Sequence, residues 1–92
     1  MSEYISIEAE YGSDPDEVRL HTNLRLTQGE PEMYTSLAEG EEGSPLAQTL
    51  FRIDGLVGLR IAERTLVVRR ASEIEWHTLI DEISTALKDF FL

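Results

Sequence analysis

The 92-residue sequence contains no cysteine, and this absence removes several kinds of chemistry at once. Without thiols the chain can form no disulfide, no thiolate zinc site and no metal cluster held by cysteine alone. The glycine patterns of P-loop and Rossmann nucleotide sites are missing, and so is the G-x-S-x-G elbow of serine hydrolases. We therefore expect a protein that is not an enzyme and that carries no cofactor.

Long apolar runs and basic residues are also scarce. No apolar run approaches the roughly 20 residues that a membrane-spanning helix needs, and the acidic start of the chain does not resemble a secretory or transit signal. Eight basic side chains stand against eighteen acidic ones, which gives a net charge of −10. This charge opposes phosphate backbones and anionic lipids, so we expect neither nucleic acid nor a membrane as a partner. The cytoplasm is the expected compartment.

The negative charge is concentrated in the first half of the chain. Residues 1–43 carry a net charge of −9, and residues 44–92 carry a net charge of −1. The simpler interpretation is that the charge keeps the protein soluble. The alternative is an acidic face that attracts a basic partner, an effect that salt screens over about 8 Å at physiological ionic strength.

The hydrophobic pattern predicts a single domain over residues 1–92. Period-two alternation predicts a first strand over Tyr4–Tyr11 and a second over Val18–Asn23 that could run on toward Leu26. A weaker pattern predicts a third strand over Met33–Leu37. The acidic, glycine-spaced residues 39–43 predict a loop.

The stretch from Ser44 to Arg70 carries the clearest structural signals. Ser44 and Pro45 predict a helix start, because a hydroxyl caps free amides and proline needs no donor at the first helical position. Gly55 predicts the end of this helix, since glycine accepts a positive φ. Residues 56–61 and 65–69 then predict a β-hairpin. In its first strand Val57, Leu59 and Ile61 are expected on one face.

The last part of the chain predicts a long amphipathic helix. Ser72 and Glu75 have the spacing of a capping box. Apolar residues then recur at steps of three and four, namely Trp76, Leu79, Ile80, Ile83, Leu87 and Phe90. The element order β-β-β-α-β-β-α predicts an α+β fold, a two-layer sandwich in which two helices cover one face of a five-stranded sheet.

Several residues of this chain stand at the positions of a known family pattern: Ser44, Pro45, Leu46, Ala47, Leu50, Phe51, Ile53, Gly55, Leu59, Leu66, Val68, Trp76 and Leu79. That pattern is S-P-L-A-x-x-L-F, I-x-G-V-x-x-V, an F-I-T-V-like strand and W-x-x-L-K-P. The chain thus resembles the N-terminal domain of Nfu/NifU proteins, which is associated with iron–sulfur cluster assembly. It departs from the pattern at Ile80-Asp81, where Lys-Pro is usual, and only Pro15 remains of the family's T-P-N-P turn.

The resemblance implies the same α+β architecture and a role in cluster assembly through protein contacts. In larger relatives a second domain with a Cys-x-x-Cys motif binds the cluster, whereas this chain has no cysteine. We therefore expect a stand-alone, non-catalytic accessory or interaction module, with an iron–sulfur assembly scaffold or a client protein as its partner. Two alternatives stay open. One is a protein that binds iron or another metal through histidine and carboxylate ligands, and the other is a regulatory interaction domain unrelated to cluster assembly.

The residues expected to bind a partner are the hairpin arginines and the single tryptophan. Arg60, Arg64, Arg69 and Arg70 make the hairpin the one basic region of an acidic protein. They could dock an acidic partner or simply protect a strand edge with charge. Trp76 could pack into the core or form a hot spot for a partner. No metal ligand is assigned, because no ligand spacing links His21 to His77.

Overall fold

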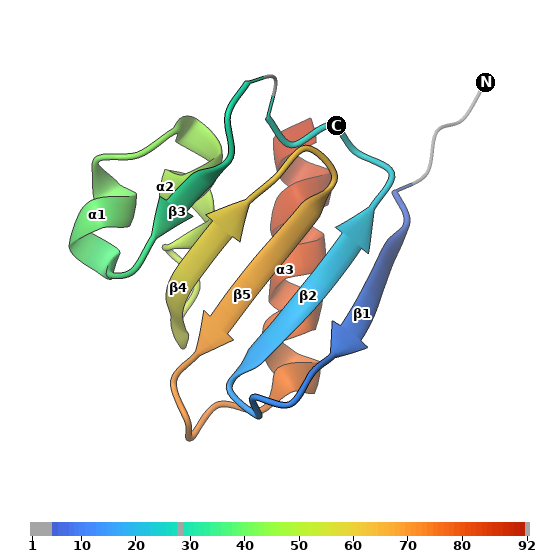
Figure 1. The fold of residues 1–92 in the computed structure, drawn as a ribbon, viewed down its shortest axis with the longest axis vertical. Helices are drawn as coiled ribbons and strands as arrows, with labels where there is room; N and C mark the ends of the chain where they lie inside the picture. Colours follow the sequence, from blue (N-terminus) through green and yellow to red (C-terminus); the bar gives the residue numbers. More distant parts are fainter. Residues whose placement is uncertain (1–4, 28, 92) are drawn as a thin grey trace.

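A computed structural model describes residues 5–27 and 29–91 of the chain. Tyr4, where the first strand was predicted to begin, lies outside these residues. Five strands form one antiparallel sheet in the order β1-β2-β5-β4-β3 (Figure 1). The strands are β1 (Ile7–Tyr11), β2 (Glu17–Thr22), β3 (Glu32–Tyr34), β4 (Leu56–Ile61) and β5 (Thr65–Arg70).

Helices cover one face of this sheet and leave the other face open. The long helix α3 (Trp76–Phe91) runs behind the sheet in Figure 1, and α2 (Pro45–Leu50) contacts α3. A third, short helix, α1 (Leu37–Glu41), lies beside β3 at the edge of the sheet. The predicted α+β arrangement, with a five-stranded sheet packed on helices, is confirmed. The face without helices is called the open face below.

The core lies between the sheet and the helices α2 and α3. Strand pairing places Val18 opposite Val68 and Leu20 opposite Leu66, and all four side chains are buried. The helices contribute Leu46, Ala47, Leu50, Leu79, Ile83 and Leu87, which are buried as well. Because successive side chains of a strand point to opposite faces, the residues between these core positions lie on the open face.

The predicted face of β4 is wrong at Val57. The register shifts between Leu56 and Gly58, so that one extra residue is inserted opposite β5. Such a bulge reverses the alternation on one side of it. Leu56 therefore joins Leu59 and Ile61 in the core, whereas Val57 is 41% exposed.

The loop predicted over residues 39–43 is helical over its first part. The third strand ends at Tyr34, and α1 then occupies Leu37–Glu41. The Ser36 hydroxyl accepts a hydrogen bond from the Glu39 amide at 3.3 Å, and the Glu39 carboxylate accepts one from the Thr35 amide at 2.9 Å. Reciprocal capping of this kind stabilises a helix start. Gly40 is needed for packing, because a Cβ there would overlap the Phe51 ring.

At the other two helices, the predicted start of α2 is confirmed, whereas its predicted end and the predicted cap of α3 are wrong. Ser44 caps α2 as predicted, since its hydroxyl accepts a hydrogen bond from the Ala47 amide at 3.3 Å. The predicted end of this helix at Gly55 is wrong, because α2 already ends at Leu50, and Gly55, with a positive φ of 95°, lies in the turn before β4. The capping box predicted for Ser72 and Glu75 is wrong. Residues 71–74 form a turn closed by a hydrogen bond from the Ile74 amide to the Ala71 carbonyl, the Ser72 hydroxyl bonds the Glu73 carboxylate, and α3 begins only at Trp76.

Candidate interaction surface

The open face carries one row of side chains that crosses all five strands. The strand register pairs Glu10 with Arg19, Arg19 with Val67, Val67 with Arg60, and Arg60 with Met33. Arg19 and Arg60 therefore lie on either side of Val67. They belong to β2 and β4, the strands that flank β5 in Figure 1. These five residues are called the cross-strand row.

Other charged groups near the row are paired. Arg69 Nη1 lies 2.9 Å from Asp14 Oδ2 and 3.6 Å from Glu17 Oε2. The pKa of Asp14 is lowered, because its carboxylate accepts a hydrogen bond from the Asp16 amide and a second from Arg69. The pKa of Arg69 is raised by the same hydrogen bond to Asp14.

The same is true of the carboxylate at the end of the row. His21 Nε2 and Glu10 Oε1 are 2.7 Å apart. The pKa of Glu10 is lowered, chiefly because His21 bonds its carboxylate and secondarily because of the charge of His21, while the Arg19 charge adds a smaller effect. Glu10 is therefore engaged mainly by His21.

Arg19 and Arg60 differ from Arg69 in having no such partner. Within residues 5–27 and 29–91, neither guanidinium forms a hydrogen bond or an ion pair, although both side chains are exposed. Two hollows of about 400 and 270 Å³ lie next to them, and both hollows are lined by Arg19, Arg60 and Val67. Met33, which is 65% exposed, borders the larger hollow.

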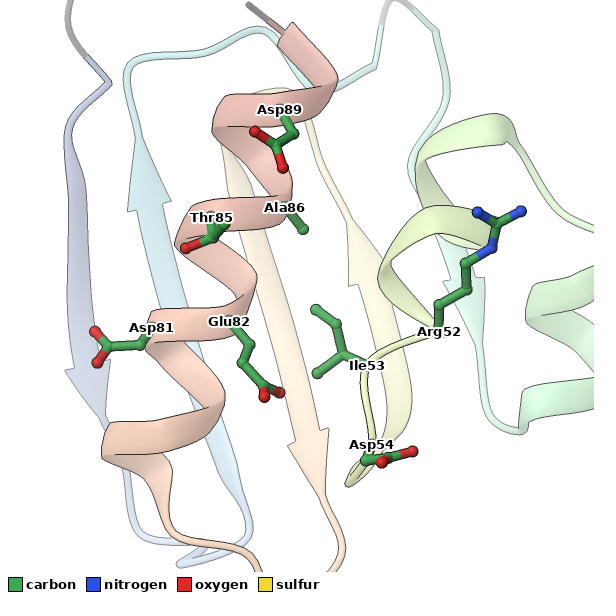
Figure 2. Close-up of a pocket in the computed structure, with 8 residues that line it drawn as sticks. All are labelled: Arg52, Ile53, Asp54, Asp81, Glu82, Thr85, Ala86 and Asp89. Atoms are coloured by element: carbon green, nitrogen blue, oxygen red, sulfur yellow. The ribbon is translucent and has the colours of Figure 1, made fainter.

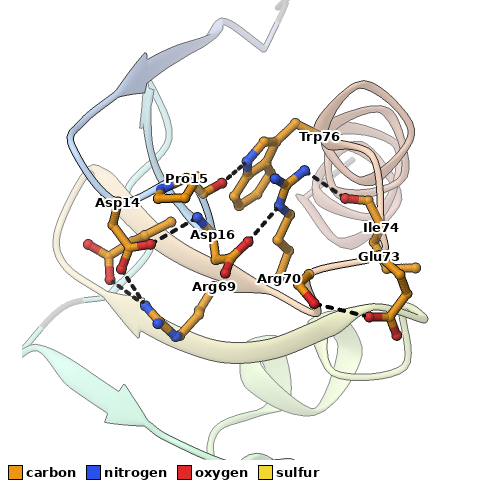
Figure 3. A network of polar contacts seen from close by, with 10 residues as sticks. Asp14, Pro15, Asp16, Arg69, Arg70, Glu73, Ile74 and Trp76 are labelled. Atoms are coloured by element: carbon orange, nitrogen blue, oxygen red, sulfur yellow. Dashed lines mark hydrogen bonds and ion pairs between the residues drawn. The ribbon is translucent and has the colours of Figure 1, made fainter.

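Arg70 and Trp76 lie on the other side of β5 and hold parts of the fold together (Figure 3). The Arg70 guanidinium lies over the Trp76 ring and donates a hydrogen bond to the Ile74 carbonyl at 2.7 Å. It also bonds the Asp16 carboxylate at 3.3 Å. Trp76 Nε1 donates to the Pro15 carbonyl at 2.8 Å. These contacts tie the β1–β2 turn to the start of α3.

The five residues predicted to bind a partner thus lie at three places. Arg60 and Arg69 share the open face, Arg70 and Trp76 form the contact just described, and Arg64 lies in the hairpin turn beside Glu63. That they bind a partner stays a prediction. Sequence analysis missed Arg19, whose alternation with Val18 and Leu20 placed it off the core but gave no sign of its neighbours.

A second hollow surface lies on the helical side of the molecule. Residues 52–54 and one side of α3 enclose a groove of about 490 Å³ (Figure 2). Ile53 and Ala86 supply apolar surface there, between carboxylates that include Glu82 and Asp89. The described residues contain no group of three histidine or carboxylate side chains placed to hold a metal ion. None of the described helices is long and apolar enough to cross a membrane.

Comparison with known proteins identifies the family. The family model described as scaffold protein Nfu/NifU N terminal matches residues 7–92. The chain belongs to the Nfu/NifU N-terminal family. NifU-like protein 4, mitochondrial, from Arabidopsis thaliana is 29% identical in an alignment over 75 residues that covers 76% of this chain and 26% of the plant protein. The chain therefore spans about a quarter of the length of this Nfu relative.

Solved structures share the Nfu N-terminal fold. The solution structure of a NifU-like protein from Saccharomyces cerevisiae superposes with a TM-score of 0.76 at 18% identity, over 97% of this chain and 82% of that one. The crystal structure of protein SAV1430 from Staphylococcus aureus gives a TM-score of 0.67 at 10% identity, over 88% and 96%. At these identities the likeness concerns the fold alone.

Proposed function

We propose that this Nfu N-terminal domain is a non-catalytic interaction module of iron–sulfur cluster assembly. In this role it binds a scaffold or a client protein through surface contacts. The observation that carries the proposal is the family match over residues 7–92, to a model described as belonging to scaffold proteins. Because cysteine thiolates are the usual ligands of iron–sulfur clusters and this chain has none, its contribution is assigned to binding rather than to holding the cluster.

The surface of the protein supports a binding role. Within the described residues no helix covers one face of the sheet, and an exposed methionine and two arginines without ion-pair partners in that part of the chain lie there. Arginine and methionine are enriched at protein interfaces relative to the rest of the surface. The hollows on the described residues are more open than enclosed, which suits contact with another protein better than the enclosure of a small substrate.

Affinity capture from the source cells tests the proposal. The tagged chain is used as bait, and a parallel capture contains an excess of the untagged chain as competitor. We expect cluster-assembly scaffolds, client apoproteins or proteins with a Cys-x-x-Cys domain to be recovered and then lost under competition. Recovery of none of these would contradict the proposal, and competed partners from other processes would favour a regulatory role instead.

A metal-binding role predicts a different result. Ferrous or zinc ions held by histidine and carboxylates would shift the amide resonances next to His21 or His77 at stoichiometric concentration. If the domain is an interaction module, we expect no saturable shift at one equivalent of either ion. A saturable shift would support the metal-binding alternative.

A further inference from the structure

We propose that Arg19 and Arg60 form a pair of carboxylate-binding groups on the open face, and that their occupant is an acidic, extended segment of the partner protein. This inference rests on the proposed function, because it names the surface and the partner chemistry of the same interaction. The cross-strand row supplies the geometry, and the unequal pairing of charges on the open face supplies the recognition chemistry.

The spacing of the two arginines suits an extended segment. Arg19 and Arg60 stand on strands separated only by β5, so their Cα atoms are about 10 Å apart, given a strand spacing of about 4.8 Å. An extended polyproline II segment rises 3.1 Å per residue with three residues per turn, so residues i and i+3 point to the same side about 9 Å apart. A segment of the form acid-x-x-acid can therefore place one carboxylate on each guanidinium.

The pairing of the other charges shows why these two arginines stand out. The chain contains eighteen carboxylates, and on the open face these satisfy Arg69 and His21. Arg19 and Arg60 have no hydrogen bond or ion pair with a described residue, so each guanidinium keeps its two-donor fork available. Such a fork matches the two oxygens of a carboxylate.

The residues around the pair favour a peptide over a free anion. Val67 is half-buried between the two arginines, and Met33 extends the row with a largely exposed apolar side chain. Apolar surface beside an ion pair excludes water and lowers the local dielectric constant, which strengthens the attraction. Side chains flanking the two acids of a peptide would cover this apolar surface, whereas a small anion would leave it exposed.

An NMR titration of the full chain with a defined probe tests the pair. The probe is the capped peptide acetyl-Glu-Leu-Pro-Glu-amide, and its control is the same peptide with both Glu replaced by Gln. We expect the Glu peptide to shift the amides of residues 19, 60 and 67 most. It should bind about fivefold more tightly than the Gln peptide, a modest preference because individual exposed ion pairs are weak. Equal binding of the two peptides, or shifts centred on the groove of Figure 2, would overturn the inference.

Matched variants separate the two arginines from charge in general. In Arg19→Gln/Arg60→Gln we expect the preference for the Glu peptide to disappear. The control Arg25→Gln/Arg52→Gln removes the same charge at two exposed arginines outside the row and should bind as the original protein does. Arg19→Lys/Arg60→Lys keeps the charge without the planar fork, so its binding should be intermediate. If the control variant loses the preference for the Glu peptide to the same extent, the inference is wrong.

Other occupants of the open face predict other results. Inorganic phosphate at the peptide's concentration should not reproduce the peptide's shifts, and the same amides should not move when the protein alone is concentrated. If phosphate reproduces the peptide's shifts, the occupant of the open face is a free anion. If the same amides move as the protein is concentrated, the occupant is a second copy of the chain. Either result would overturn the inference.

Affinity capture with the Arg19→Gln/Arg60→Gln bait separates this inference from the proposed function. We expect the cluster-assembly partners to be lost from this bait and kept by the Arg25→Gln/Arg52→Gln bait. If both baits retain the partners, the inference about Arg19 and Arg60 is wrong, while the proposed role in cluster assembly is still supported. If the peptide binds at the cross-strand row but no cluster-assembly protein is captured, the proposed function is wrong, while the carboxylate-binding pair is still supported.

Discussion

The guanidinium of Arg70 lies 5.0 Å from the centre of the Trp76 ring, and the two side chains together join three segments of the chain. Arg70 ends β5, Trp76 begins α3, and the indole nitrogen donates to the Pro15 carbonyl in the turn between β1 and β2 (Figure 3). Trp76 also packs against the core, with its side chain partly buried. The contact therefore has a structural role that is separate from the open face.

Replacing the indole tests the bond to Pro15. Trp76→Phe keeps an aromatic ring but removes the donor to the Pro15 carbonyl, so we expect the free energy of unfolding to fall by about 0.5–1.5 kcal/mol. Urea denaturation followed by circular dichroism measures the change, because the variant lacks the only tryptophan fluorophore. An unchanged midpoint would contradict the structural role of this bond.

Two arginines of the hairpin should differ in their effect on stability. The Arg70 side chain is 18% exposed and bonds Asp16 and the Ile74 carbonyl, so Arg70→Met should lower the free energy of unfolding by about 1.5–3 kcal/mol. The Arg64 side chain is 59% exposed in the hairpin turn. Arg64→Met should therefore change the free energy of unfolding by less than about 0.5 kcal/mol. Thermal and urea denaturation of both variants provide the comparison. If the two substitutions lower the free energy of unfolding equally, the contacts of Arg70 do not stabilise the fold more than those of Arg64.

Two serines make a similar test of helix capping. Ser36 caps α1, and Ser36→Ala should lower the free energy of unfolding by about 0.5–2 kcal/mol. Ser72 lies in the turn before α3 without capping it. The free energy of unfolding of Ser72→Ala should therefore stay within about 0.5 kcal/mol of that of the original protein. The reverse order of the two costs would support the capping box read from the sequence.

Asp14 should make stability depend on pH in acid. Its pKa is lowered in the folded protein by the Asp16 amide and by Arg69, so ionised Asp14 favours the folded state. This stabilisation is present above the ordinary aspartate pKa of 3.8 and is lost as the pH falls through the lower pKa of the folded state. We therefore expect Asp14→Asn to be less stable than the original protein at pH 7.

The difference between the two proteins should close as the solution becomes strongly acidic. Chemical denaturation between pH 7 and pH 2 measures it, and Arg69→Gln should show the same convergence because it removes the other side of the contact. The double variant should add little to either single change. A stability difference that persists at the acid end would mean that the carboxylate charge is not its cause.

Local signals explain what the sequence predicted well. The Ser44-Pro45 start, the positive φ of Gly55 and the alternation in β2 and β5 each depend on a few neighbouring residues. The helix α1 was missed because its acidic, glycine-containing composition is typical of a loop. The Ser36 and Glu39 contacts and the packing of Gly40 on Phe51 outweigh that composition.

The cross-strand row could not be predicted because it depends on contacts between distant parts of the chain. Arg60 faces Val67 across the β4–β5 hairpin, whereas Arg19 becomes a neighbour of Val67 only because β2 pairs with β5 in the strand order β1-β2-β5-β4-β3. The bulge at Val57 depends on the exact register between β4 and β5, which the alternation within β4 alone does not give. Sequence alternation indicates which side of a strand faces the core, but not which strand lies beside it.

Photo-crosslinking from the open face tests the central claim, that this domain binds a partner of cluster assembly, most directly. The photoreactive residue p-benzoylphenylalanine replaces Met33 in one chain and Phe90 on α3 in another, and both positions are exposed. After irradiation in the source cells, we expect the Met33 position to crosslink to a cluster-assembly scaffold or client protein, and the Phe90 position not to do so. Crosslinks from Met33 to no such protein would contradict the account.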